Sequence, residues 1–312
     1  MKGSPGPVPA RWVSDEVLDL AAAGPVSGSV LARFGSTLHA EIEGFVIAVL
    51  PPTAPRMPNG LSVAAGLAGG RGPEVGDPVR LSDGGLAAGR LAIGWHPDRP
   101  PRWDARVPRW TPAELAGLSA RANAILASSA DGIRRDVAAE YLAGIDGFRD
   151  DDRGARDGVG SLLAAVRTGD PRVAASAGLQ LVGRGPGLTP LGDDILAAAA
   201  LTMGSVGAAN GSTSARQSAW LSALAPPDLR KRTTSVSATL LELAIRGRGM
   251  GPVHALLDPD PSRDRRLTAE LGRLRRLGHT TGPAYAAAIG AVALVLAPPN
   301  DLPNHTTKEQ IA

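Results

Sequence analysis

The residues best suited to chemistry lie in one stretch, Gly183-Arg184-Gly185-Pro186-Gly187-Leu188-Thr189-Pro190-Leu191-Gly192-Asp193-Asp194. A glycine-rich loop that opens a helix gathers unpaired backbone N–H groups at the positive end of the helix dipole, where an anion binds well. Glycine also lets a ligand approach the backbone closely. An arginine adds a forked donor for carboxylate or phosphate. The residues expected to bind an anionic substrate here are Gly183, Arg184, Gly185, Gly187 and Thr189.

Two common phosphate motifs do not fit this stretch. A Walker loop ends in Gly-Lys followed by Ser or Thr, and no lysine is present here. A dinucleotide fingerprint follows a strand, whereas residues 173–181 are rich in alanine and typical of a helix. The stretch therefore predicts an anion site of another kind.

Asp193 and Asp194 allow three interpretations. In the first, the pair only complements the dipole at the start of the helix that follows. In the second, it holds a divalent cation such as Mg²⁺, which prefers carboxylate oxygens. In the third, it accepts hydrogen bonds from an amide or ureido NH₂ group while the loop holds the anionic end of the same ligand. Adjacent helical residues point about 100° apart, so we expect only one of the two to face a given ligand.

Two other helix starts carry polar groups. Thr233, Thr234 and Ser235 follow three basic residues and offer hydroxyl and N–H groups to an anion, or simply cap the helix. His279 and Thr280 lie between Gly278 and Gly282, where the histidine is either an acid, base or donor, or a turn residue without a chemical role. We hypothesise that these two starts converge with the glycine-rich loop on one pocket.

Composition excludes several classes of function. The chain of 312 residues has no Cys, so disulfides, thiolate catalysis and Cys-ligated zinc are excluded. The net charge is only +3 and aromatic residues make up 3%, which argues against nucleic-acid binding. No apolar run is long enough for a membrane span, and the N-terminus lacks the apolar core of a signal peptide. We expect a cytoplasmic protein.

The fold class predicted is α+β, with a small N-terminal antiparallel β domain followed by a larger all-helical domain. Residues 1–27 are expected to form a flexible N-terminus and a short helix, and residues 28–107 the β domain, because short alternating or apolar runs are separated by Gly and Pro turns. Residues 299–312 are expected to be a tail.

Residues 111–298 are expected to form the helical domain that contains the Asp pair. Thr111-Pro112-Ala113-Glu114 has the pattern of a capping box with proline at the first helical position. Apolar residues then recur at helical spacing. Helices are predicted at 112–127, 131–145, 157–168, 171–182, 192–206, 214–225, 233–247, 263–277 and 283–297.

The run Gly185 to Asp194 resembles the hallmark Gly-x-Gly-Leu-Thr-Pro-Ser-Gly-Asp-Asp of a bacterial family long known as a domain of unknown function. That family takes its name from the third subunit of oxamate carbamoyltransferase, the AllH-like proteins. Weaker similarities include the strand-like segment 28–49 with Pro58 and Asn59, and the two other helix starts. The resemblance covers about residues 28–298. It departs at Leu191, where the hallmark has Ser, and at residues 283–285, where an acidic residue is expected.

The resemblance implies a subunit that acts with other carbamoyltransferase subunits in anaerobic allantoin breakdown, where oxalurate and phosphate interconvert with oxamate and carbamoyl phosphate. It implies that the glycine-rich loop and Arg184 bind the anionic end of oxamate, oxalurate or carbamoyl phosphate. Asp193 or Asp194 would hold NH₂ groups or Mg²⁺. The hydroxyls at 233–235 would bind phosphate, and His279 would donate to the carbonyl oxygen, with Thr280 beside it.

Two alternatives remain. The chain is a non-catalytic binding or assembly subunit that needs a partner for turnover, which the lack of an evident base or nucleophile favours. Or the Asp motif is only a tight junction between helices.

Overall fold

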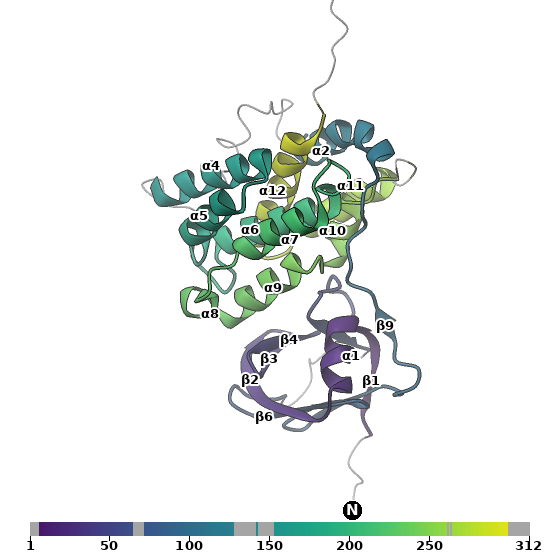
Figure 1. Ribbon diagram of the computed structural model, residues 1–312. Helices are drawn as coiled ribbons and strands as arrows, with labels where there is room; N and C mark the ends of the chain where they lie inside the picture. The colour runs from purple at the N-terminus through teal and green to yellow at the C-terminus, as the bar shows by residue number, and fades with distance from the viewer. Residues whose placement is uncertain are drawn as a thin grey trace, which may run out of the picture.

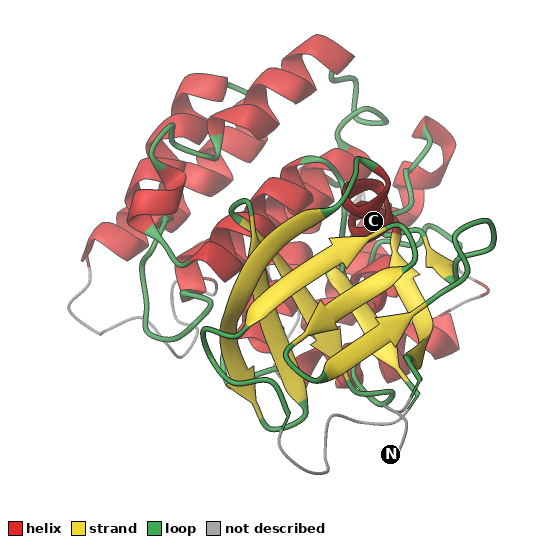
Figure 2. Ribbon diagram, turned by 90° about the horizontal axis from the view of Figure 1, so that it is seen from below, coloured by secondary structure: helices red, strands yellow, loops and turns green. Residues whose placement is uncertain are grey.

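The computed structural model describes residues 6–64, 72–127, 142, 153–260, 262 and 264–298. An N-terminal β-barrel with one short helix is followed by a larger assembly of helices (Figure 1). Figure 2 views the strands of the barrel with the helices behind them. The predicted order of a β part and a helical part is therefore present, and the overall α+β class is consistent with the structure.

The barrel is closed by eight strands in the order β1-β5-β4-β3-β2-β6-β7-β8, with β8 returning to β1, and β9 pairs outside it with β1. Apolar side chains alternate along the strands and fill the interior; in β3, for example, Leu38, Ala40 and Ile42 are buried. Helix α1 (Asp15–Ala22) packs Val17 and Leu18 against the same core. The strands are β1 (Val8–Ser14), β2 (Val26–Phe34), β3 (Thr37–Ile42), β4 (Phe45–Leu50), β5 (Gly60–Val63), β6 (Pro78–Ser82), β7 (Gly85–Ala88), β8 (Leu91–Gly94) and β9 (Arg102–Trp103).

The prediction of an antiparallel β domain is wrong, because the barrel is mixed. Strand β1 runs parallel to β8, with Val8 opposite Ile93, and β4 runs parallel to β5, with Ala48 opposite Gly60. The direction of β1 is set by barrel closure, which removes the exposed strand edges. Closure depends on pairing between strands that are far apart in the sequence, so no local pattern of residues predicts it.

The first strand was missed by the sequence prediction, which placed residues 1–27 outside the β domain. Val8–Ser14 pairs with β5 and β8, although Pro9 lies within it. Proline lacks a backbone N–H donor, so a proline within a segment argues against a strand there. The strands that pair with β1 lie far along the chain, and the local sequence therefore does not indicate them. The predicted short helix after this strand is present as α1.

The helical part is built around α6 and α12, whose side chains are almost all buried. Alanine and glycine on both helices allow the close packing that a core poor in aromatic residues requires. The helices are η1 (Pro112–Gly117), α2 (Leu118–Leu126), α4 (Arg153–Thr168), α5 (Pro171–Leu181), α6 (Leu191–Val206), α7 (Ser214–Ala223), α8 (Leu229–Arg232), α9 (Ser235–Ile245), α10 (Gly251–Leu256), α11 (Asp264–Arg275) and α12 (Thr281–Leu296).

Most predicted helices correspond to these elements within a few residues, with three differences. The predicted helix 112–127 begins as the 3₁₀ turn η1, although the Glu114 carboxylate accepts from the Thr111 amide at 2.7 Å as the capping box requires. Helices α8 and α10 were not predicted. Apart from Leu142, the predicted helix 131–145 lies outside the described residues, as does the predicted tail 299–312.

Helix α9 and strand β4 join the barrel to the helices. The backbone amide of Val46 donates to the Thr239 hydroxyl at 3.1 Å in a buried position. Val46 also forms a small apolar cluster with Val236 and Leu240, and Leu188 of the glycine-rich loop packs against it. The loop therefore lies next to the barrel as well as next to the helices.

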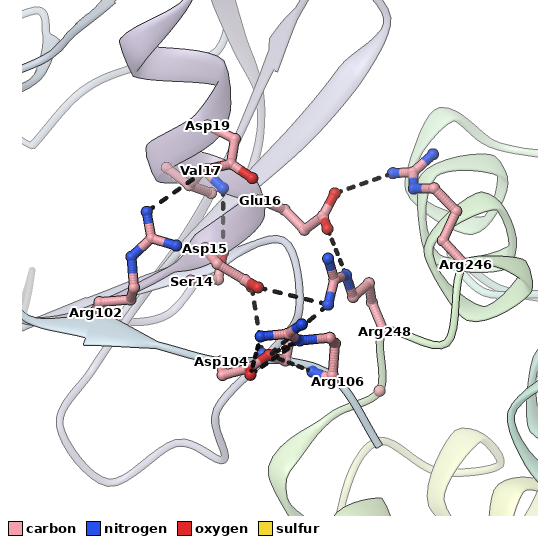
Figure 3. A network of polar contacts seen from close by, with 12 residues as sticks. Ser14, Asp15, Glu16, Val17, Asp19, Arg102, Asp104, Arg106, Arg246 and Arg248 are labelled. Carbon is pink, nitrogen blue, oxygen red and sulfur yellow. Dashed lines mark hydrogen bonds and ion pairs between the residues drawn. The ribbon is translucent and has the colours of Figure 1, made fainter. Parts of the chain in front are cut away.

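A second junction is polar and centres on Arg248 (Figure 3). Its guanidinium bonds the Glu16 carboxylate at 2.6 Å and lies 3.6 Å from Asp15 and 3.7 Å from Asp104. Arg246 reaches the same Glu16 at 3.2 Å. Acidic groups of the barrel thus depend on arginines that follow α9, and the two parts are held by charge as well as by apolar packing.

Replacing Arg248 by Met should lower the free energy of unfolding by about 1–3 kcal/mol, because Asp15 and Glu16 would lose their most buried cation. This loss is smaller than the loss expected for a fully buried ion pair, because the Arg248 side chain is 19% exposed. Urea denaturation followed by far-UV circular dichroism measures the change. The control is Arg106→Met, whose exposed side chain pairs with Asp104 and should matter much less. Equal losses in the two variants would contradict the assignment.

Candidate functional site

Asp193 is buried in the first turn of α6 and joins two other segments to this helix. Its Oδ1 accepts from the backbone amide of Gly183 at 2.8 Å, and its Oδ2 accepts from the Thr233 hydroxyl in a short hydrogen bond. Gly183 has a φ of 75°, and a Cβ there would lie 2.1 Å from the carbonyl oxygen of Arg232. Only glycine fits at this contact, so the loop and the start of α9 are held together at Asp193.

Asp194 faces a different set of groups. The Thr189 and Thr281 hydroxyls lie near its carboxyl, and their oxygens are 2.7 Å apart in a hydrogen bond. Within the described residues, its Oδ2 is buried and has no hydrogen-bond partner. The side chain as a whole is only 2% exposed. The two adjacent carboxyls therefore differ: the oxygens of Asp193 are both occupied, and one oxygen of Asp194 is not.

Tyr285 completes the surroundings of Asp194. It follows Thr281 by one helical turn on α12, so the two side chains lie on the same face. Burial raises the pKa of the Tyr285 hydroxyl well above its usual value, and the nearby charges of Asp194 and Asp193 raise it further. The hydroxyl therefore lies within electrostatic range of both carboxyls.

Burial also governs the pKa values of the Asp pair. It raises the pKa of Asp194 well above its usual range, and the neighbouring Asp193 charge adds to this, while the Thr281 and Thr189 hydroxyls oppose it. Burial raises the pKa of Asp193 as well, against the hydrogen bonds from Thr233 and Gly183. Hydrogen bonds to both oxygens favour an ionised Asp193, so Asp194 is the one that holds a proton more readily.

The starts of α6, α9 and α12 thus meet at the Asp pair. Close backbone approaches make this possible. A Cβ on Gly192 would lie 2.0 Å from the Leu181 carbonyl oxygen, and one on Gly282 would lie 1.8 Å from that of Leu274. Three positive helix ends directed at two carboxyls partly offset the repulsion between them.

The remaining predicted residues of the loop lie around this centre. Arg184 is exposed, and its Nε donates to the Gln180 carbonyl at 3.2 Å. Gly185 and Gly187 have φ values of 106° and 101°, which give the loop its turns. A Cβ on Gly187 would meet no atom within 4 Å, so the backbone there borders open space.

The starts of α9 and α12 contribute unequally to the surroundings of the Asp pair. The Thr234 hydroxyl accepts from the Ser237 amide at 3.1 Å and donates to the Leu188 carbonyl at 2.6 Å, so it caps α9 and fixes the loop. Ser235 and Thr280 are half-buried. His279 is exposed, and no hydrogen bond joins it to either Asp among the described residues.

Few side chains at this site could act as ligands of a magnesium ion. No group of three or more His, Cys, Asp or Glu side chains in the described ranges is arranged to hold a metal ion. Both oxygens of Asp193 already accept hydrogen bonds from Gly183 and Thr233. The donors present therefore fit an organic hydrogen-bonding ligand better than a divalent cation.

The three converging helix starts lie within one match to a known family. Residues 181–293 match the family model for the oxamate carbamoyltransferase subunit AllH. The resemblance to AllH is thus confirmed for this part of the chain, which is less than half of it. Searches of curated proteins and of solved structures gave no match. The AllH match ends within α12 and leaves out the barrel.

Sequence reasoning missed two residues of the site inside the AllH match. Tyr285 was noted only as a departure from the family, and Thr281 only as part of a hydroxyl-rich helix start. The spacing of four residues between them was a usable signal, because it places both side chains on one helical face. What that face meets, namely Asp194, depends on how α12 packs on α6.

Within residues 6–64, 72–127, 153–260 and 264–298, no helix combines the length and apolar character needed to cross a bilayer.

Asp193→Asn should lower the free energy of unfolding by about 1–3 kcal/mol, because an amide cannot accept from both Gly183 and Thr233 and leaves one buried donor unpaired. Thr233→Val removes one of these bonds from the other side. Urea denaturation of both single variants and the double variant measures the coupling, which should make their effects non-additive. Strict additivity would show that the Thr233 contact does not stabilise the fold.

Asp194→Asn should instead raise the free energy of unfolding near neutral pH. A carboxyl whose folded pKa is raised binds its proton more tightly in the folded state, so its contribution to stability is largest in acid and falls as the pH rises above about 4. The amide cannot ionise and avoids this loss. Thermal unfolding over a range of pH should show the wild type losing stability relative to the variant as pH rises. Parallel profiles would contradict a raised pKa of Asp194.

Proposed function

We propose that the chain is a subunit of an enzyme of the oxamate carbamoyltransferase type, and that it binds oxamate, oxalurate or carbamoyl phosphate at the Asp pair. The observation that carries this proposal is the meeting of three helix starts at two buried carboxyls. The AllH match over residues 181–293 supports the same function, since it includes all three starts. Its subunit name supports a hetero-oligomer with other carbamoyltransferase subunits.

The proposed ligands carry an anionic end and a carbamoyl or amide end. Backbone N–H groups of the loop from Gly183 to Gly187, with Arg184 at its exposed side, are suited to the anionic end. The start of α9, with Thr233, Thr234 and Ser235, is suited to phosphate because its N–H groups lie at the positive end of a helix. Asp194 is suited to the NH₂ group.

Carbamoyl transfer at such a site needs no covalent intermediate on the protein. The amide nitrogen of oxamate attacks the carbamoyl carbon of carbamoyl phosphate, the carbon–oxygen bond to phosphate breaks, and phosphate leaves with the electron pair while the nitrogen loses a proton. Holding the two reactants together supplies much of the rate. His279 is the candidate donor to the carbonyl oxygen as negative charge develops, and Thr280 lies beside it.

A non-catalytic binding or assembly subunit is the second candidate. The groups that contact Asp193 and Asp194 in the described residues are hydroxyls and a backbone amide, with no imidazole or amine among them. A small carboxylate can bind at the backbone N–H groups of the glycine-rich loop, but both oxygens of Asp193 are engaged in hydrogen bonds, so the site lacks an evident free base. In this case a partner subunit supplies the base.

Calorimetric titration of the purified chain with oxamate, oxalurate and carbamoyl phosphate, each with and without Mg²⁺, tests the proposal. At least one compound should bind, and Asp194→Leu should weaken that binding. Asp98→Asn is the matched control, because it removes an exposed carboxylate of the barrel and should leave binding unchanged. No heat with any of the three compounds would contradict the proposal.

An activity assay separates the two candidates. Oxamate-dependent release of phosphate from carbamoyl phosphate by the chain alone indicates a catalytic subunit. Release only after addition of the co-encoded subunits indicates a binding or assembly subunit.

A further inference from the structure

The Oδ2 atom of Asp194 is an unusual feature of the structure. It is buried and lacks a hydrogen-bond partner among the described residues, on a side chain that is 2% exposed. A buried carboxyl oxygen without a partner is costly, so such atoms in native proteins call for an explanation. No arginine, lysine or histidine of the described chain forms an ion pair with it. The atom is therefore placed to meet a group that is not part of the protein.

Tyr285 is a second polar side chain beside Asp194. It is 2% exposed, its hydroxyl lies within electrostatic range of Asp194, and no hydrogen bond of that hydroxyl is found within the described residues. Buried tyrosine hydroxyls ordinarily find a partner. A buried carboxyl oxygen without a partner on α6 and a tyrosine hydroxyl on α12 thus lie within electrostatic range of each other.

We propose that the Asp194 carboxyl and the Tyr285 hydroxyl together bind the carbamoyl (C(=O)–NH₂) end of the ligand and make the site selective for an amide over a carboxylate. This inference rests on the proposed function, because it assigns the orientation of the ligand in that same site. The anionic end then points toward the backbone N–H groups of the glycine-rich loop.

The chemistry of the two groups matches an amide and not an anion. A protonated carboxyl offers one O–H donor and one carbonyl acceptor side by side, which pair with the oxygen and the N–H of a primary amide. Burial and the adjacent Asp193 charge both raise the pKa of Asp194 and so favour this form. A second carboxylate placed here would meet the charge of Asp193 with no cation beside it, which a buried site tolerates poorly.

Oxamate and oxalate provide the test on the wild-type chain, because they differ only in having an amide or a carboxylate at one end. Isothermal titration should show oxamate binding at least about tenfold more tightly than oxalate, equivalent to about 1.4 kcal/mol. Equal affinity for the two compounds would overturn the inference.

Variants identify the residues responsible. Tyr285→Phe removes one hydrogen bond and should weaken oxamate binding about three- to tenfold while leaving weak oxalate binding unchanged. Asp194→Leu should weaken oxamate binding at least about thirtyfold. Asp194→Asn keeps one donor and one acceptor, so it should retain most of the affinity, whereas a carboxylate acting as a charged acceptor would lose it on this change.

Thr202→Val is the matched control. It alters a buried hydroxyl on the same helix, where Oγ1 bonds only the Ala198 carbonyl at 2.8 Å, two turns away from the Asp pair. Its binding should equal that of the wild type. Circular dichroism and thermal unfolding establish that each variant is folded before titration.

The outcomes separate this inference from the proposed function. If the wild type binds none of oxamate, oxalurate and carbamoyl phosphate, the proposed function fails. If the wild type binds oxamate and Asp194→Leu weakens that binding, but Tyr285→Phe leaves it unchanged or oxalate binds equally well, only the present inference fails. Loss of oxamate affinity in Asp194→Asn equal to that in Asp194→Leu would also overturn it.

Discussion

The helical part depends on the hydrogen bonds that the Asp193 carboxylate accepts at the start of α6. One comes from Gly183 in the loop after α5, and the other from Thr233 just before α9. A single buried side chain thus fixes a loop and a helix to the central helix of the core. The arrangement requires glycine at 183, because the backbone there has a positive φ and touches the chain at Arg232.

Helix α9 extends this constraint to the barrel. Thr233 just before this helix and Ser237 in its first turn lie near Asp193, whereas Val236 and Leu240 pack against β4. The Thr239 hydroxyl accepts from a β4 amide. The barrel therefore supports the same helix whose start borders the candidate site, although the AllH match does not include it.

The neighbouring carboxyl shows why the site is better explained by ligand binding than by stability alone. One carboxylate in the first turn is enough to complement the helix dipole, and Asp193 supplies it while accepting hydrogen bonds from Gly183 and Thr233. Asp194 adds a second buried acid, one of whose oxygens lacks a partner in the described residues. Burial raises the pKa of Asp194, and this costs stability at neutral pH. Hydroxyls and helix ends lower that cost without removing it. A group with an N–H donor would complete the arrangement.

The sequence by itself determined the α+β class, most helices and the Asp motif, because apolar periodicity, Gly and Pro punctuation and the Gly-rich run are local signals. It also indicated that three helix starts share hydroxyl and glycine residues. The tertiary structure alone decided the direction of β1, since barrel closure is set by strands far along the chain. It alone separated the roles of Asp193 and Asp194 and brought Tyr285 to the site. Adjacent residues on a helix point in different directions, and only packing against α9 and α12 decides what each one meets.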